Sequence, residues 1–325
     1  MPVQRQKTYI AGHAGLVGSA LVRHARAVGL APLITRTVEQ LDLRNHEQVD
    51  QFFAVEQPTH VLLAAARVGG IWANATQPAS FIYDNLMMTL ATIHAAHKHA
   101  VKKLLFFGSS CIYPRDCAQP ICEEYLLTGP LELTNKAYAI AKIAGLELCQ
   151  AYNQQYGTQF ISCMPTNLYG PGDNFDDQSS HVIPALIGRM YRATIENAPY
   201  VTIWGTGRPR REFLFVDDLA QAAFFLMDHY SDSLPINVGV GYDIEIAELA
   251  LLIKQIIGYG GQLRFDQSKP DGTPRKLLNV ERITALGWRA KTSLQTGLQK
   301  TIDWYISKQS DQYAQVHQVN VGDSI

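Results

Sequence analysis

The sequence predicts an α/β fold, a doubly wound parallel sheet joined to a second, smaller α/β unit. Two features of the 325 residues lead to this expectation. The first half of the chain alternates short apolar runs with longer amphipathic stretches, which is the spacing of a parallel sheet with helices on both faces. After Pro165 the alternation gives way to turn-rich sequence with mixed strands and helices.

The elements of the first half follow one another as strand and helix. Their type is assigned from the period of their apolar residues. We expect strands over residues 8–11, 31–35, 60–64, 104–108 and 160–164, and helices over 16–28, 47–55, 79–99 and 136–156. Residues 216–229 predict a further helix, opened by Asp217 and Asp218, and residues 235–240 a strand that returns to the sheet.

This order of elements predicts two domains. Residues 1–173 together with 212–240 are expected to form the sheet domain. Residues 174–211 together with 241–325 are expected to form the smaller domain, which would bind a substrate. Residues beyond about 307 are polar and weakly periodic, and they predict a frayed end.

Composition excludes several other classes of protein. Hydrophobic residues make up 47% and charged residues 18%, as in ordinary globular proteins. The net charge of −1 lacks the basic field that nonspecific nucleic-acid binding needs. No apolar stretch reaches the roughly 18 residues of a membrane span, and the first residues lack a signal-peptide core. The five cysteines include no Cys-x-x-Cys pair, so we expect a cytoplasmic protein with reduced thiols.

A glycine-rich turn follows the first predicted strand and opens the first predicted helix. Its sequence is Gly12-His-Ala-Gly15-Leu16-Val17-Gly18. Glycine allows the backbone to turn sharply and to approach a ligand, and the helix N-terminus presents N–H groups to pyrophosphate. The spacing differs from the commoner Gly-x-Gly-x-x-Gly, so the turn predicts a dinucleotide site of Rossmann type mainly through its place between strand and helix.

The residues after the second predicted strand indicate which dinucleotide binds. An acidic side chain there usually holds the ribose hydroxyls of NAD. Here the first carboxylate is Glu39, and Arg36 stands where it would meet a 2′-phosphate. We therefore expect NADP rather than NAD, with Asp42 and Leu43 near the adenine.

Three side chains predict hydride-transfer chemistry. Tyr138 and Lys142 are four residues apart and share a helix face. A nearby ammonium would lower the pKa of the tyrosine, which could then give a proton to a carbonyl oxygen. Alone this pair is common by chance, but Ser109 ends a buried strand where ligands of parallel sheets bind. Ser109 would align the carbonyl with Tyr138.

These features together resemble the extended short-chain dehydrogenase/reductase family, and further blocks resemble one branch of it. The branch converts GDP-4-keto-6-deoxy-D-mannose into GDP-L-fucose with NADPH. The resemblance runs from about Tyr9 to Trp288. The matching blocks are Ser109-Ser-Cys111-Ile-Tyr-Pro114, Pro165-Thr-Asn-Leu-Tyr-Gly-Pro171, Ser180-His181-Val-Ile-Pro184, Arg210-Arg211-Glu-Phe and Lys269-Pro-Asp-Gly-Thr-Pro-Arg275-Lys276.

The resemblance implies epimerisation at C3 and C5 followed by reduction at C4. Cys111 matches the family's base and His181 its acid, whereas either residue taken alone would more often be structural. A thiol and an imidazole both titrate near neutral pH with modest tuning. Ser109 and Tyr138 would stabilise the enolate oxygen, and Lys142 would hold the nicotinamide ribose.

The resemblance also implies the remaining binding residues and a homodimer. Cofactor contacts are expected from Gly12, Gly15, Leu16, Val17, Gly18, Arg36, Asp42, Leu43, Ala64, Ala65, Lys142, Pro165, Asn167, Leu168 and His181. Contacts to the GDP-sugar are expected from Arg189, Trp204, Arg211, Asp271 and Lys276. The dimer would form through the two long helices predicted over 79–99 and 136–156.

Two departures and four alternatives accompany this interpretation. Ala14 and Gly172 stand where arginine and histidine are common in the branch, and Ala14 removes one partner of the 2′-phosphate. A 4,6-dehydratase would carry an acidic pair where Ser110 and Cys111 stand, and a C4 epimerase would not need Cys111 with His181. A reductase of another GDP-4-keto sugar, such as a deoxyheptose, and a non-catalytic NADP sensor remain as alternatives.

Overall fold

The computed structural model describes residues 7–176, 179–269 and 271–319. Its main element is a parallel sheet of β1 (Thr8–Ala11), β2 (Leu33–Ile34), β3 (His60–Leu63), β4 (Lys103–Phe107), β5 (Phe160–Pro165) and β10 (Ile236–Val238). The strands lie in the order β10-β5-β4-β3-β1-β2, and every neighbouring pair is parallel. The order reverses between β1 and β3, which is where ligands of such sheets bind, at the carboxyl ends of the strands.

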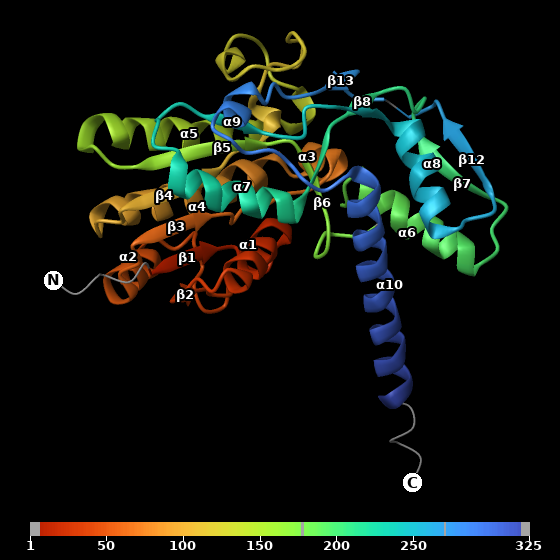
Figure 1. Ribbon diagram of the computed structural model, residues 1–325, viewed down its shortest axis with the longest axis horizontal. Helices are drawn as coiled ribbons and strands as arrows, with labels where there is room; N and C mark the ends of the chain where they lie inside the picture. The colour runs from red at the N-terminus through yellow and green to blue at the C-terminus, as the bar shows by residue number, and fades with distance from the viewer. Residues whose placement is uncertain (1–6, 177–178, 270, 320–325) are drawn as a thin grey trace.

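Helices cover both faces of this sheet (Figure 1). One face packs against α1 (Leu16–Ala27) and α7 (Val216–His229). The other packs against α2 (His46–Glu56), α4 (Pro78–Lys98) and α5 (Lys136–Tyr156). Successive strand residues point to opposite faces, so both faces need apolar side chains and the strands are almost continuously hydrophobic.

The two long helices approach the sheet closely at a glycine. A Cβ on Gly145 of α5 would lie 2.7 Å from Thr89 of α4 and would also meet the ring of Phe106 in β4. This position therefore has room only for hydrogen. Helix α5 ends at Gly157, which has the left-handed conformation (φ +66°) typical of a helix end.

The second part of the chain packs around its own apolar core. That core joins α6 (Val182–Ile195), α8 (Ile246–Ile257) and the start of α10 (Leu294–Val319) to the parallel pair β7 (Tyr200–Trp204) and β12 (Gln262–Asp266). The remaining elements are short, namely α3 (Ile71–Thr76), α9 (Glu281–Ala285), β6 (Asn167–Tyr169), β8 (Arg210–Arg211), β9 (Phe213–Phe215), β11 (Ile244–Glu245), β13 (Arg275–Lys276) and the 3-10 turns Ser110–Ile112, Glu123–Tyr125 and Leu133–Asn135.

The fold class and the order of elements expected from the sequence are confirmed, with two corrections. The strand expected over 31–35 is only Leu33–Ile34. The frayed end expected beyond about 307 is wrong as far as Val319, because α10 continues to that residue and projects from the body of the molecule (Figure 1). The rest of that expectation, residues 320–325, lies outside the described residues. Residues 298–319 contain no glycine or proline that would end a helix. Within the described residues, no helix is long and apolar enough to cross a membrane.

Candidate active site

The glycine turn between β1 and α1 packs directly against the end of β3. Gly12 has a φ of +80°, and a Cβ there would lie 2.6 Å from the Cα of Ala65. A Cβ on Gly18 would lie 2.6 Å from the carbonyl carbon of Gly12. Gly15 precedes α1 without a side-chain cap, so the first N–H groups of the helix face outward for a ligand.

This turn fits the pyrophosphate of a dinucleotide, because its cradle admits an approaching phosphate only while the glycines lack a Cβ. The structure brings together at the ends of β1 and β3 the predicted residues Gly12, Gly15, Leu16, Val17, Gly18, Ala64 and Ala65.

Arg36 follows β2, as expected, but its guanidinium already has partners. Its Nη2 lies 2.5 Å from Oε1 of Glu56, and its Nη1 donates to the carbonyl oxygen of Thr35 at 2.8 Å. The guanidinium also stacks 5.6 Å from the ring centre of Phe52. A 2′-phosphate at this position would therefore compete with Glu56 for Arg36.

The two residues expected near the adenine have different surroundings. Leu43 is buried in the core against α2 and α4. Asp42 accepts hydrogen bonds from Arg44, with Nε to Oδ1 at 2.9 Å and Nη2 to Oδ2 at 2.8 Å. Arg44 also approaches Asp84 at 3.5 Å. Arg44 is thus a second cation beside the end of β2 that the sequence analysis did not single out.

Ser109, Tyr138 and Lys142 meet at the carboxyl end of β4. Ser109 precedes the turn Ser110–Ile112 with extended backbone, and its Oγ accepts from the N–H of Cys111 at 3.3 Å. Lys142 donates from Nζ to the carbonyl oxygen of Phe107 at 2.7 Å and lies 5.7 Å from the ring centre of Tyr138. The end of the strand thus fixes the lysine, and the lysine lies beside the tyrosine.

The expected lowering of the tyrosine pKa is contradicted. Burial raises the pKa of Tyr138, and the nearby Cys111 raises it further, while a hydrogen bond with Ser109 acts the other way. Burial also lowers the pKa of Lys142 to about 8. The ammonium is desolvated and bound to Phe107, so it does not dominate the titration of the phenol. Tyr138 is fully protonated at neutral pH, as a proton donor must be.

Cys111 is buried, and one cation faces it from a distant part of the sequence. Burial raises the pKa of the Cys111 thiol, and Lys276 is the strongest opposing influence, ahead of Ser109 and Lys142. Lys276 lies on β13, more than 160 positions further along the chain. Lys276 was expected from the sequence to contact the GDP-sugar, and in the structure its charge also acts on the thiol.

His181 immediately precedes α6 and remains exposed at the edge of the site. Although the residue as a whole reaches the surface, protein atoms surround its imidazole, and this desolvation lowers the imidazole pKa; the charge of Lys276 lowers it further. The segment before it is fixed by Gly70, whose N–H donates to the carbonyl oxygen of Ser179 at 2.9 Å. Lys276 therefore acts electrostatically on both members of the implied base and acid pair. At neutral pH the pair rests as thiol and neutral imidazole.

Cationic and aromatic side chains lie together on the second part of the chain. Arg189 of α6 and Lys269 each lie 5.5 Å from the ring of Trp204 at the end of β7. Trp204 is 57% exposed, so a planar group that displaces either cation could stack on its ring. Arg189 and Trp204 border a shallow groove of about 380 Å³ that also includes Tyr200.

Arg211 and Asp271 face each other across the turn after β7. Asp271 accepts from the N–H of Thr206 at 2.6 Å and from its hydroxyl at 2.7 Å, which fixes the turn. Burial lowers the pKa of Arg211, and Asp271 opposes that shift. Arg211 is paired with Lys276 in the ladder of β8 and β13, so two cations lie side by side. Such a pair suits a diphosphate.

Two further features were missed from the sequence. Burial raises the pKa of Asp173 to about 7, and its Oδ2 is buried without a hydrogen-bond partner among the described residues. The neighbouring Gly172 approaches the hydroxyl of Ser19 in α1, so this turn packs on the dinucleotide cradle. Glu212 is fully buried between Arg211 and Phe213. In the sequence, the signal for it was a carboxylate directly before the apolar run Phe213-Leu-Phe-Val216.

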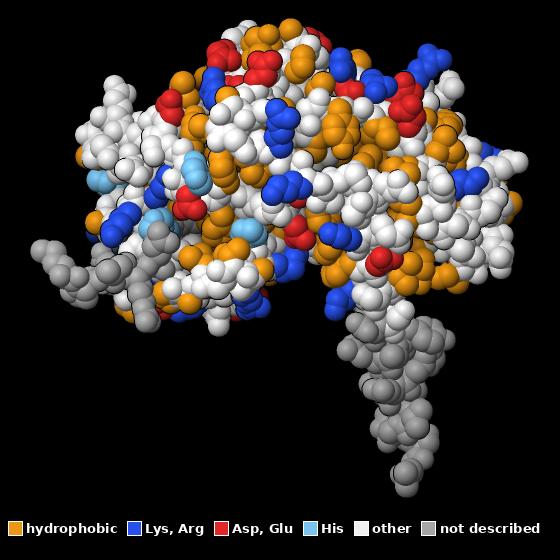
Figure 2. Space-filling model, viewed as in Figure 1, with side chains coloured by type: hydrophobic (Ala, Val, Ile, Leu, Met, Phe, Trp, Pro, Cys, Tyr) orange, Lys and Arg blue, Asp and Glu red, His pale blue; other side chains and the backbone are white. Residues whose placement is uncertain are grey.

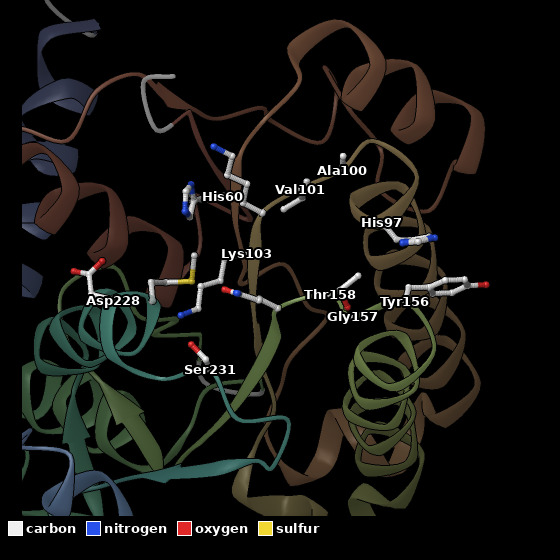
Figure 3. Close-up of a pocket in the computed structure, with 13 residues that line it drawn as sticks. His60, His97, Ala100, Val101, Lys103, Tyr156, Gly157, Thr158, Asp228 and Ser231 are labelled. Carbon is white, nitrogen blue, oxygen red and sulfur yellow. The ribbon is translucent and has the colours of Figure 1, made fainter. Parts of the chain in front are cut away.

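A separate hollow of the described surface lies away from these residues. It measures about 870 Å³ and lies at the opposite, amino-terminal edge of the sheet, between His60, Lys103 and Asp228 (Figure 3). None of the predicted site residues lines it. Figure 2 shows a different hollow between α1 and α10, bordered on both sides by Lys and Arg side chains.

Comparison with known proteins places the chain in a family. Residues 8–239 match the model of the NAD dependent epimerase/dehydratase family. That match covers more than half of the chain, and the chain belongs to this family. The resemblance inferred from the glycine turn and from Ser109, Tyr138 and Lys142 is thereby confirmed.

The relatives within the family agree with the branch expected from the sequence. The GDP-L-fucose synthase of Escherichia coli K12 is 52% identical over 94% of this chain and 98% of its own. A GDP-L-fucose synthetase from Naegleria fowleri, solved with NADP bound, has a TM-score of 0.88 at 28% identity, covering 95% of this chain and 96% of its own. A GDP-6-OMe-4-keto-L-xylo-heptose reductase from C. jejuni has a TM-score of 0.89 at 38% identity, over 94% and 98% of the two chains.

Proposed function

We propose that the protein is an NADPH-dependent enzyme that converts GDP-4-keto-6-deoxy-D-mannose into GDP-L-fucose. The observation that carries the proposal is that Ser109, Tyr138 and Lys142 meet Cys111 at the end of one strand. The charge of Lys276 acts on both Cys111 and His181. A simple reductase needs the first three residues, whereas epimerisation needs a base and an acid in addition.

The epimerisation steps follow from the acidity of carbons beside a ketone. The step begins when the thiol proton of Cys111 passes to His181, which gives a thiolate and an imidazolium. The thiolate then removes a proton from C5 or C3, and the electron pair moves to the C4 oxygen as an enolate. Ser109 and Tyr138 donate hydrogen bonds to that oxygen. His181, once protonated, returns a proton to the opposite face of the carbon, which inverts it.

The reduction uses the same oxygen site. NADPH, bound in the glycine cradle, would supply the hydride that C4 accepts. Tyr138 gives its proton to the C4 oxygen as the carbonyl becomes an alcohol, a role that suits a phenol held protonated by burial. Lys142, bound to the end of β4, fixes the position of Tyr138 and would hold the nicotinamide ribose.

The division of labour between the two parts of the chain belongs to this proposal. Residues 1–173 and 212–240 would hold the cofactor, since β10 joins the main sheet beside β5. Residues 174–211 and 241–325 would hold the GDP-sugar, with the guanine on Trp204 and the diphosphate near Arg189 and Arg211. Free thiols at all five cysteines support a cytoplasmic enzyme.

The protein would act as a homodimer. Helices α4 and α5 pack together and still expose large apolar side chains. Tyr83 and Leu90 of α4 are 61% and 43% exposed, and Ile140 of α5 is 38% exposed. Pairing two copies of this face would bury them. Light scattering at micromolar concentration should give twice the 36.1 kDa of the chain, and a monomer would contradict this part of the proposal.

The test of the proposed reaction is the product formed in deuterated water. GDP-4-keto-6-deoxy-D-mannose and NADPH should give GDP-L-fucose with deuterium at C3 and C5 in the NMR spectrum. A reduced sugar without deuterium at these carbons would leave a reductase and remove the roles of Cys111 and His181.

A second candidate is reduction of a larger GDP-4-keto sugar, with one epimerisation or none. The similarity to the C. jejuni heptose reductase favours it, because that protein shares the fold over nearly its whole length. Faster turnover of a GDP-4-keto-heptose than of the deoxymannose substrate would select this candidate.

A further inference from the structure

Glu212 is completely buried beside the site, and the reaction proposed above gives it no part. Its side chain accepts three backbone hydrogen bonds. Oε1 accepts from the N–H of Val240 at 2.6 Å and of Gly241 at 2.8 Å, and Oε2 accepts from the N–H of Leu278 at 3.0 Å. Burial raises the pKa of this carboxyl, and the N–H donors oppose that shift. Such a carboxylate is held in place by its hydrogen bonds.

The backbone of Glu212 also forms hydrogen bonds with the residues that follow β5, where the cofactor is expected to bind. Its carbonyl oxygen accepts from the side-chain amide of Asn167 at 2.8 Å and from the hydroxyl of Thr166 at 3.3 Å. Its N–H donates to the carbonyl oxygen of Lys276 at 3.3 Å. One residue thus ties the end of β5, the segment after β10 and the strand β13 together.

Strand β13 is also held from its other side. The N–H of Ile121 donates to the carbonyl oxygen of Leu277 at 2.8 Å, and the N–H of Leu277 donates to Oε1 of Gln119 at 2.9 Å. Residues 119–121 belong to the loop that follows Cys111. Residues 276–278 are therefore clamped between Glu212 and the loop that follows Cys111, which fixes Lys276 near the thiol.

We propose that Glu212 is a positioning residue whose carboxylate holds the strand that carries Lys276 against Cys111. The titratable groups that face Cys111 are Lys276 from β13 and Tyr138 and Lys142 from α5. Of these, Lys276 favours the thiolate most. Of the two elements that carry these groups, Glu212 anchors β13, through Leu278 and Lys276. The consequence for epimerisation rests on the proposed function, but the effect on the thiol itself does not.

Replacing Glu212 by glutamine removes the charge and changes the hydrogen-bonding groups of the side chain while keeping its size. The amide side chain has one acceptor oxygen where the carboxylate has two. If that oxygen stays with Val240 and Gly241, the amide NH₂ faces the N–H of Leu278, and two donors oppose each other. Glu212→Gln should therefore release the end of β13 and displace Lys276. Glu212→Asp keeps the charge but is one methylene shorter, and we expect an intermediate effect.

The chain offers a matched control. Glu123 is also buried, at 7% exposure, and its Oε1 accepts from the N–H of Asn237 in β10 at 2.9 Å. It pairs with Arg282 and makes no hydrogen bond to β13. Glu123→Gln removes a buried carboxylate of the same kind from the same region while leaving the Lys276 strand in place.

The first experiment follows alkylation of Cys111 by iodoacetamide against pH in the full-length, NADP-saturated protein, with the Cys111 peptide quantified by mass spectrometry. Glu212→Gln and Lys276→Met should both move the midpoint upward by roughly one pH unit, as expected when a cation leaves a thiolate. Glu123→Gln should leave the midpoint unchanged. A wild-type midpoint in Glu212→Gln, a wild-type midpoint in Lys276→Met, or an equal shift in Glu123→Gln would each overturn the proposal.

The second experiment measures deuterium entry at C3 and C5 of the GDP-keto sugar. Glu212→Gln should lower the rate about tenfold, the loss expected for one charged buried hydrogen bond, with unchanged affinity for NADPH. A wild-type exchange rate, or an equal loss of NADPH affinity, would contradict the positioning role. If the wild-type protein exchanges no deuterium at all, the proposed function fails, and the alkylation result still decides the role of Glu212.

Discussion

The dinucleotide end and the sugar end of the site are built in different ways. The glycine turn, the start of α1 and the end of β3 come from regular elements of one sheet, and their key residues lie within seven consecutive positions and one neighbouring strand. The sugar end gathers Cys111, His181, Arg211 and Lys276 from four distant segments. Two of these stand on strands of only two residues.

This difference teaches where each end is vulnerable. The dinucleotide end depends on close backbone packing, so small added volume should damage it. The sugar end depends on single hydrogen bonds that join loops, so it should tolerate volume in many places and fail when one anchor is lost. The following variants test the comparison, from the largest expected effect to the smallest.

Replacing Tyr138 by phenylalanine should cost the most, because both the epimerisation and the reduction use its hydroxyl. Reduction should fall by about 10²- to 10⁴-fold, the usual contribution of a general acid. NADPH oxidation in the presence of the ketosugar measures the effect, and NADPH affinity should hardly change. Retention of more than a tenth of the activity would show that another group supplies the proton.

Gly18→Ala should disable the dinucleotide end. Its Cβ would lie 2.6 Å from the carbonyl carbon of Gly12 and 2.7 Å from the Cα of His13, so the turn must shift. We expect NADPH affinity to fall about 100-fold, equivalent to about 3 kcal/mol, in a fluorescence titration.

Gly15→Ala is the matched comparison within the same turn. Its Cβ would have only an ordinary contact of 3.6 Å with the oxygen of Gly12. The protein without ligand should keep its stability. If Gly15→Ala and Gly18→Ala unfold at the same reduced temperature, close packing is not the distinguishing property of this end.

Gly70→Ala should damage the sugar end alone. A Cβ on Gly70 would lie 2.9 Å from the carbonyl oxygen of Ser180, which pushes away the segment that carries His181. Deuterium exchange should fall about tenfold, the effect of losing one anchoring hydrogen bond. NADPH titration is the control, and a parallel loss of cofactor affinity would remove the distinction between the two ends.

Glu56→Gln should give the smallest effect, a rise in the preference for NADPH over NADH. The variant weakens the pairing of Glu56 with Arg36 and leaves the guanidinium available to a 2′-phosphate. Because the pair is partly exposed, we expect preference for NADPH over NADH to rise by about threefold. Arg36→Ala should abolish that preference. Unchanged selectivity in both variants would assign the 2′-phosphate to another cation, such as Arg44.

Local sequence was sufficient to predict an element or a motif wherever its residues act through their immediate neighbours in the chain. The helix over 136–156 has the expected bounds, and α1 and α4 agree within one residue at each end, because their apolar period is long and regular. The turn from Gly12 to Gly18 was found for the same reason. The shortness of strand β2 was not predicted, because packing decides it. The extension of α10 to Val319 was missed because the segment is polar and weakly periodic, although no glycine or proline ends the helix there.

The sequence by itself determined the fold class, the dinucleotide cradle and the identity of the groups at the end of β4. These depend on periodicity and on contiguous motifs, which can be read directly from a single amino-acid sequence. Only the tertiary structure decided how those groups are charged and held. It raised the pKa of Tyr138 where the sequence predicted a lowering, paired Arg36 with Glu56, and brought Lys276 to Cys111 through Glu212. Desolvation and hydrogen bonds between distant segments set these properties, and neither is encoded in spacing along the chain.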